Sequence, residues 1–127
     1  MYDKDLAREV LIQIHGAAKK ILRRFEPIRS SDDFTNSEAG MEKLDSICMQ
    51  LIAIGESLKK LDKMTQKSLL SKFPEIEWKK IMGMRDIISH HYFDVDADVI
   101  YDVCENHVED LAAVIGKMLV EIDAPAD

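Results

Sequence analysis

Apolar residues recur every three or four positions along almost the whole chain, and this helical spacing constrains the fold more than any other feature. One apolar stripe runs from Leu6 to Phe25 and a second from Met41 to Leu61, and Pro27 lies between them. Gly55 lies within the second stripe. Because glycine disfavours a helix interior, we expect another helix to pack closely at Gly55. The first stripe predicts a helix of about 20 residues and consists of Leu6, Val10, Ile14, Ala17, Ile21 and Phe25.

The segments between these stripes are assigned from their turn and cap residues. Residues 29–36 are polar and are expected to form a loop. Thr35 with Glu38 has the spacing of a capping box, so the second helix is expected to begin there. A shorter helix is expected over about 65–72, ending before Pro74.

Two further helices complete the prediction. One carries Trp78 and fades near His91, with Glu75 or Glu77 in its first turn, where an acidic side chain suits the helix dipole. Because no segment alternates as a strand does, the sequence predicts an all-α fold, an antiparallel bundle of four to five helices. The last helix is expected over about 97–121, with its inward stripe made of Val99, Val103, His107, Leu111, Val114 or Ile115, and Met118.

The length of 127 residues suits a single helical domain over residues 1–122, followed by a frayed tail at 123–127. No apolar run reaches the roughly 18 residues that a membrane span needs, and the charged N-terminus lacks the apolar core of a secretory signal. Two cysteines, Cys48 and Cys104, cannot build a disulfide framework and lie on or near apolar stripes, so inert thiols in a reducing cytoplasm are expected.

The charge is divided unevenly along the chain. Residues 1–85 hold 16 Lys and Arg against 13 Asp and Glu, whereas residues 86–127 hold Lys117 against 11 acidic residues. With a net charge of −7, the protein cannot coat nucleic acid through a basic face as a whole. Two local patches could still contact phosphates or could be ordinary solvated helix faces: Lys19, Lys20, Arg23 and Arg24, and Lys59, Lys60, Lys63 and Lys67.

The segment from Arg85 to Tyr92 places a permanent cation, a group that titrates near neutral pH and a phenol within eight positions. On an ideal helix, Arg85 and Tyr92 lie within roughly 20° of each other, whereas His90 lies roughly 140° from Arg85. All three converge only if the helix ends or distorts there. A purely structural alternative is that Arg85 pairs with Asp86 or another acid and His90 caps the helix end.

This segment and its neighbours resemble the HepT-like branch of the HEPN superfamily. The resemblance spans about residues 5–120 and is most specific over residues 73–96, where the Arg-x4-His-x-Tyr motif lies in a wider matching context. The matching stretches are Ile54-Gly55-Glu56, Phe73-Pro74-Glu75-Ile76-Glu77-Trp78, Ile81-Met82-Gly83-Met84-Arg85 and His90-His91-Tyr92-Phe93-Asp94-Val95-Asp96.

The resemblance implies a homodimer in which the motifs of both subunits face a shared cleft, and a metal-independent endoribonuclease that acts on RNA as the toxin of a toxin–antitoxin pair. It also implies a partner, a minimal nucleotidyltransferase antitoxin that transfers AMP to the motif tyrosine. Carried over to this chain, Arg85 and His90 are catalytic and Tyr92 is the AMPylation target. Asp86 departs from the family's frequent Asn, and Asp94 stands where Gly is common.

The chemistry suits these residue types. RNA cleavage without a metal requires a base for the ribose 2′-hydroxyl, charge stabilisation at phosphorus and an acid for the leaving 5′-oxygen. His90 can exchange protons near neutral pH, and Arg85 can donate several hydrogen bonds to the nonbridging oxygens. One chain offers one motif histidine for two proton transfers, which a dimeric cleft resolves.

Alternatives remain for the function and for individual residues. A noncatalytic subunit could keep the fold and use the motif only to bind a nucleotidyltransferase. No cofactor or metal is expected, because adjacent His90 and His91 point apart on a helix and no di-iron motif repeats. Glu56 could support the cleft or be a structural carboxylate, and Trp78 is expected in the core rather than as a base-stacking platform.

Overall fold

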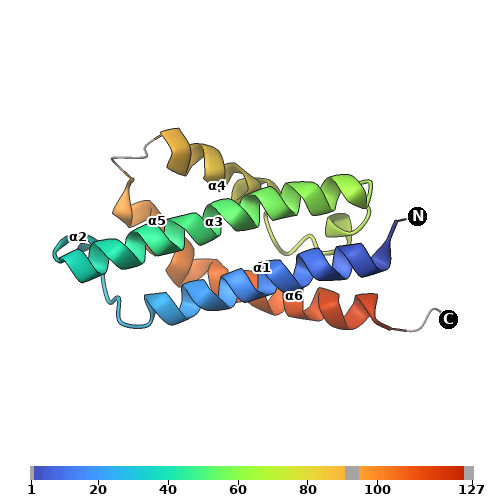
Figure 1. The fold of residues 1–127 in the computed structure, drawn as a ribbon, viewed down its shortest axis with the longest axis horizontal. Helices are drawn as coiled ribbons and strands as arrows, with labels where there is room; N and C mark the ends of the chain where they lie inside the picture. Colours follow the sequence, from blue (N-terminus) through green and yellow to red (C-terminus); the bar gives the residue numbers. More distant parts are fainter. Residues whose placement is uncertain (1, 91–94, 125–127) are drawn as a thin grey trace.

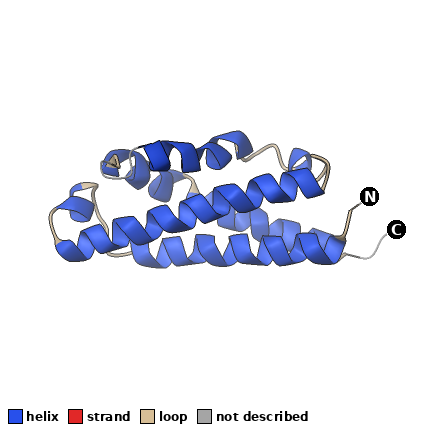
Figure 2. Cartoon of the chain, turned by 45° about the horizontal axis from the view of Figure 1, so that its top comes forward, coloured by secondary structure: helices blue, strands red, loops and turns tan. Residues whose placement is uncertain are grey.

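The computed structural model describes residues 2–90 and 95–124, with the backbone alone at His90. These residues form helices and connecting turns, without strands (Figure 2). The all-α prediction is therefore confirmed for the described chain. In chain order the elements are α1 Lys4–Phe25, α2 Asp32–Thr35, α3 Glu38–Met64, the short 3-10 helix η1 Leu70–Lys72, α4 Trp78–His90, α5 Ala97–Asn106 and α6 Val108–Ile122.

Helix α1 packs along α3 on one side and along α6 on the other, and α4 packs on α3 (Figure 1). Successive long helices run in opposite directions, so α1 is antiparallel to both α3 and α6. The apolar stripes that the spacing predicts meet along these contacts. The side chains that are most completely enclosed include Leu11, Ile14, Ile21, Ile47, Leu51, Ile54, Leu58, Leu61, Leu111 and Ile115.

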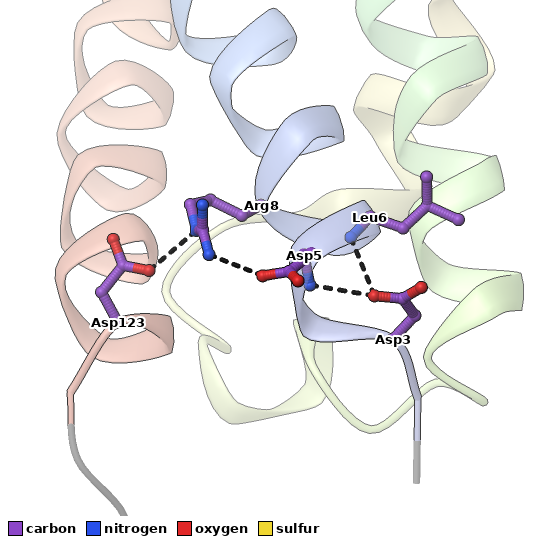
Figure 3. A network of polar contacts seen from close by, with 5 residues as sticks. All are labelled: Asp3, Asp5, Leu6, Arg8 and Asp123. Atoms are coloured by element: carbon purple, nitrogen blue, oxygen red, sulfur yellow. Dashed lines mark hydrogen bonds and ion pairs between the residues drawn. The ribbon is translucent and has the colours of Figure 1, made fainter.

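Asp3, just before α1, and Asp123, just after α6, anchor both ends of the described chain (Figure 3). Asp3 accepts hydrogen bonds from the backbone N–H groups of Asp5 and Leu6, at 3.0 and 3.2 Å, which caps α1. Arg8 bridges Asp5 and Asp123 at 2.8 Å each. Asp123, which the sequence assigned to a frayed tail, therefore contacts α1, while residues 125–127 lie outside the described chain.

The prediction of a plain loop over residues 29–36 was wrong. This segment contains the single turn α2, and Phe34 is completely buried there, with its ring centroid 6.2 Å from that of Phe25. A lone aromatic residue in a polar run has no periodic partners, so the spacing could not place it. Tyr101 holds the same segment by donating a hydrogen bond to the Arg29 carbonyl at 2.9 Å.

The predicted capping box at Thr35 was also wrong. The cap of α3 is Ser37, whose hydroxyl accepts a hydrogen bond from the Gly40 N–H at 3.0 Å. Thr35 instead ends α2 and donates its hydroxyl to the Asp32 carbonyl. Ser37 has no Glu three residues later, which is why the spacing favoured the neighbouring threonine.

Helix positions near 65–78 also differ from the prediction. The expected short helix over 65–72 is a turn followed by η1. Glu75 and Glu77 both precede α4, which begins at Trp78 and has no acidic residue in its first turn. Pro74 disfavours a helical conformation at the residue before it, and Ile76 and Trp78 are both buried in the segment that follows. Helix α4 therefore begins later than the sequence predicts.

The predicted last helix over 97–121 is two helices, α5 and α6, with a break at His107 (φ −128°, ψ −32°). The apolar spacing continues across the break, so it gave no sign of the bend. Helix α5 contacts α1, α2 and α3, whereas α6 follows α1, and one straight helix cannot make both sets of contacts. Four residues predicted to face inward are exposed instead: Leu6, Met41, Val99 and His107.

None of the described helices is both long enough and apolar enough to cross a membrane. The break at His107 and the turn α2 bring the described α-helices to six, against the four to five that the sequence predicts.

Gly40 gives a stability test at the corner between α2 and α3. A Cβ at this position would collide with the carbonyl oxygen of Asp33, whereas a Cβ at Gly16, on the exposed face of α1, would meet nothing. We expect Gly40→Ala to lower the free energy of unfolding by about 1–3 kcal/mol through overpacking. Gly16→Ala is the control and should raise it by about 0.5–1 kcal/mol through helix propensity.

Chemical denaturation of the two variants, monitored by circular dichroism, measures both changes. If Gly40→Ala were as stable as the natural chain, the close approach of α2 and α3 would be wrong.

Candidate active site

Helix α4 carries the predicted motif, and its position is set by close packing on α3. A Cβ on Gly55 would lie 3.2 Å from the carbonyl oxygen of Ile81 and 3.3 Å from that of Met82. The expectation that a helix approaches Gly55 is therefore confirmed. The start of α4 is fixed by Trp78, which is 9% exposed and donates its indole N–H to the Phe73 carbonyl at 2.9 Å. Trp78 is a core residue, as the sequence predicts.

Arg85 projects from α4 toward Glu56 on α3. Its Nε lies 3.1 Å from Glu56 Oε1, while its Nη1 lies 3.8 Å from Asp86 Oδ1. The Arg85 and Glu56 side chains are 49% and 50% exposed. The guanidinium is thus held at one nitrogen by a carboxylate from another helix and remains open to solvent. Both supporting residues suggested by the sequence, Glu56 and Asp86, lie next to Arg85.

Of the other two motif residues, the structure describes only the backbone of His90. Helix α4 is described as far as His90, and its predicted end near His91 lies outside the described residues. Positions 85 and 90 therefore lie roughly 140° apart around the helix axis, as on an ideal helix. The side chain of His90, and the whole of Tyr92, lie outside the described residues. Their roles stay predictions from the sequence.

Two grooves flank α4. On one side is a groove of about 510 Å³, here called the apolar groove, which reaches α5 and the start of α6. Gly83 and Ile87 line it from α4, and Ile87 is 49% exposed. Position 90 follows Gly83 and Ile87 at the i+7 and i+3 spacing, so it lies on the same stripe of the helix.

The second groove, of about 650 Å³, lies between the first turn of α4 and the segment after α3. We call it the lysine groove, because Lys67, Lys79 and Lys80 line it. Trp78 and Met82 line it as well, and Arg85 follows them on the same stripe of α4 at i+7 and i+3. Arg85 therefore lies on the stripe of α4 that lines the lysine groove, one turn beyond Met82.

The two cysteines lie in the core, on α3 and α5. Burial raises the pKa of Cys48 to about 11, with a further contribution from Asp45. Burial raises the pKa of Cys104 to about 12, with a further contribution from Cys48. Both thiols stay protonated at neutral pH, which confirms the expectation that they are inert.

Within residues 2–90 and 95–124, no group of three or more His, Cys, Asp or Glu side chains is arranged to hold a metal ion. His107, predicted to face inward, is exposed, and its Nε2 lies 3.8 Å from Asp102 Oδ2.

Nothing in the sequence singles out Lys79 or favours one lysine patch over the other. Lys67 and Lys79 are 12 positions apart and come together only because the chain reverses between α3 and α4. The Glu56–Arg85 pair spans 29 positions and depends on the same reversal. Its only sequence signal was a carboxylate beside a helix-interior glycine.

Comparison with known proteins gives a consistent result. The family model described as Ribonuclease HepT-like matches residues 14–118. "Putative RNase MJ0127" of Methanocaldococcus jannaschii is 28% identical over 116 residues, covering 83% of this chain and 93% of that protein. "Putative RNase MJ1216" of the same organism is 26% identical over 110 residues, covering 78% and 86%.

A third relative from that organism, "Gamma-glutamylcyclotransferase and putative RNase MJ0434", is 27% identical over 104 residues, covering 82% of this chain but 44% of the relative. No solved structure matches the chain significantly.

Proposed function

Since the chain belongs to the HepT-like ribonuclease family, we propose that it is a metal-independent endoribonuclease, the toxin of a toxin–antitoxin pair. Arg85 and His90 are its catalytic residues, and they act in a cleft between two copies of the chain. The resemblance noted in the sequence agrees with the family match, and relatives named as RNases support the reaction class.

The observation that carries the proposal is the state of Arg85. A guanidinium has five N–H donors. Glu56 Oε1 lies 3.1 Å from its Nε, and Asp86 Oδ1 lies 3.8 Å from its Nη1. Glu56 thereby limits the rotation of the side chain, while about half of the side chain stays exposed. Held in this way, Arg85 can donate to the nonbridging oxygens of a phosphodiester.

The proposed reaction uses the RNA's own 2′-hydroxyl. A histidine takes the proton from this hydroxyl, and the 2′-oxygen forms a bond to phosphorus. The bond from phosphorus to the 5′-oxygen breaks, and a second acid gives that oxygen its proton. Arg85 stabilises the additional negative charge on the nonbridging oxygens during the transfer. The products are a 2′,3′-cyclic phosphate and a 5′-hydroxyl, so no metal-bound water is required.

Incubating the purified protein with total cellular RNA in the presence of EDTA tests this function. We expect cleavage at the same rate with and without the chelator. If the protein bound a nucleotidyltransferase but cleaved no RNA in any buffer, it would be a noncatalytic binding subunit instead.

We expect the protein to be a homodimer in solution. Because positions 85 and 90 lie on different sides of α4, one copy does not gather both groups on one face of the helix. Ile87 adds an exposed apolar side chain on the stripe that position 90 shares. Light scattering at micromolar concentration should give twice the 14.5 kDa of one chain.

Ile87→Asp should shift this equilibrium to the monomer, because it would bury a charge without a partner. Met49→Asp is the matched control, since Met49 is an exposed apolar residue on α3. A natural chain that stays monomeric at all concentrations contradicts the shared cleft.

We expect control of the enzyme by AMPylation of Tyr92. Co-expression with a minimal nucleotidyltransferase encoded beside the gene should raise the intact mass by one or more adenylyl groups. Each group adds a phosphate charge and bulk near the RNA site, which opposes substrate phosphate. Tyr92→Phe should retain ribonuclease activity, because proton transfer rests on His90, and should escape modification. An unmodified Tyr92 in a fully inhibited complex would show inhibition by occlusion.

A further inference from the structure

We propose that the lysine groove binds the backbone of single-stranded RNA and guides it to Arg85. This inference rests on the proposed ribonuclease function and adds the path of the substrate. It assigns phosphate contacts to Lys67 and Lys79, with Lys59 and Lys63 extending the path along α3.

The positions of the lysines on α3 support this path. Helices α3 and α4 are antiparallel where they pack (Figure 1). On α3, Glu56, Lys59 and Lys63 follow one another at i, i+3 and i+7, which places them on one stripe. The Glu56–Arg85 contact at 3.1 Å places one end of this stripe beside Arg85. Along α3, Lys59 and Lys63 lie between Glu56 and the groove residue Lys67.

The charges of these lysines also favour a phosphate ligand. Within the part of the chain that the structure describes, neither Lys67, Lys79 nor Lys63 has a carboxylate within ion-pair distance. The acidic lining residue Glu77 is already paired with Lys80 at 2.9 Å. The remaining acid, Asp62, is half-buried. Exposed ammonium groups without partners are available to phosphates, which release bound counterions when they are neutralised.

The backbone at Lys67 also supports this path. Helix α3 ends in a turn in which the Gln66 N–H donates to the Lys63 carbonyl at 3.2 Å and the Lys67 N–H to the Asp62 carbonyl at 2.8 Å. Gln66 and Lys67 have φ values of 53° and 63° although neither is glycine. Such conformations are strained and persist where the surrounding structure holds them. This turn presents Lys67 at the edge of the groove.

The distribution of charge along the chain favours a single strand. Residues 86–127 carry 11 acidic residues against one lysine, so a broad duplex would meet repulsion beyond the groove. A single strand can run from the groove over the surface of α3, past Lys63 and Lys59, to Arg85 without crossing the acidic part of the chain. Trp78 is buried and hydrogen-bonded, so the contacts are to phosphates rather than by stacking on this ring.

The structure also supplies a matched control. Lys19 and Lys20 form the other basic patch, and both are exposed without ion pairs in the described chain. They lie on α1, which packs on α3 and α6. Lys67→Ala with Lys79→Ala and Lys19→Ala with Lys20→Ala lower the net charge by the same two units. They differ in whether the lysines lead to Arg85.

The experiment measures binding of a fluorescent single-stranded RNA by anisotropy at several salt concentrations, with His90→Ala in every protein to prevent cleavage. For the Lys67/Lys79 pair, we expect about tenfold weaker binding near 0.1 M salt. The slope of log K against log salt should become shallower by about 1.4, from two lost single-strand phosphate contacts. The Lys19/Lys20 pair should leave the slope unchanged. The proposed path is wrong if both pairs weaken RNA binding equally, or if the Lys67/Lys79 pair does not weaken it.

A second readout separates this path from the proposed catalysis. With His90 present, the Lys67/Lys79 variant should cleave a long RNA with lower kcat/KM yet cleave a dinucleotide at the natural rate, because a dinucleotide reaches only the motif. If RNA binds as described but nothing is cleaved, the ribonuclease proposal fails and the path stands. If the variant cleaves long RNA at the natural rate, the proposed path is wrong and the ribonuclease proposal stands.

Discussion

Replacing His90 with alanine is expected to slow RNA cleavage by about 10²–10⁴-fold, the usual contribution of a positioned general acid or base. His90 is the only motif group that exchanges protons near neutral pH, so its loss removes both the base for the 2′-hydroxyl and the acid for the 5′-oxygen. The measurement is the single-turnover rate on a defined RNA. Because alanine has a high helix propensity, the substitution should leave helix content and thermal stability nearly unchanged.

His107→Ala is the matched control for His90→Ala. His107 is an exposed histidine at the boundary between α5 and α6, and its contact with Asp102 at 3.8 Å is a surface pair. This variant should cleave RNA at the natural rate. If His90→Ala also cleaved at that rate, the assigned site would be wrong.

Replacing Arg85 with alanine is expected to slow the same step by about 10²–10³-fold, as the loss of one donor to a developing oxyanion does. The reduction should appear in kcat more than in KM, because the additional charge exists only in the transition state. Arg85→Lys should recover only part of the rate, since a lysine keeps the charge but loses the planar set of donors.

Glu56→Gln tests whether Glu56 positions Arg85. It removes the charge that holds Arg85 Nε at 3.1 Å and should lower kcat without lowering stability, since both side chains are about half exposed. In an Arg85→Ala background, Glu56→Gln should have no further effect on the rate. A full additional loss in that background would show that Glu56 acts independently of Arg85.

The helices were predictable because each long one buries a regular stripe. Leu44 to Leu61 on α3 and Val10 to Phe25 on α1 follow the 3.6-residue period, and both stripes are buried. The turn α2 was not predictable in this way, because Phe34 is buried without any periodic neighbour. The bend at His107 was hidden because the stripe continues through it, and only the contacts of α5 require it.

The candidate site shows the same division. The motif residues could be named from local order along the chain, since Arg85 and His90 lie on one helix. The partner of Arg85 could not be chosen, because Asp86 is adjacent in sequence whereas Glu56 is the closer contact, at 3.1 Å against 3.8 Å. The close packing of α4 on α3 at Gly55 brings Glu56 next to Arg85. The two lysine patches were likewise equivalent until α3 and α4 were placed side by side.

The chemical ends of the RNA products distinguish attack by the 2′-hydroxyl from hydrolysis by a metal-bound water. Mass spectrometry of a defined oligonucleotide cut by the natural protein in EDTA identifies both new termini. We predict a 2′,3′-cyclic phosphate on one product and a 5′-hydroxyl on the other, since the 2′-oxygen attacks phosphorus and the 5′-oxygen leaves. Products with a 5′-phosphate and a free 3′-hydroxyl, or no cleavage without added metal, would contradict an Arg85 and His90 ribonuclease.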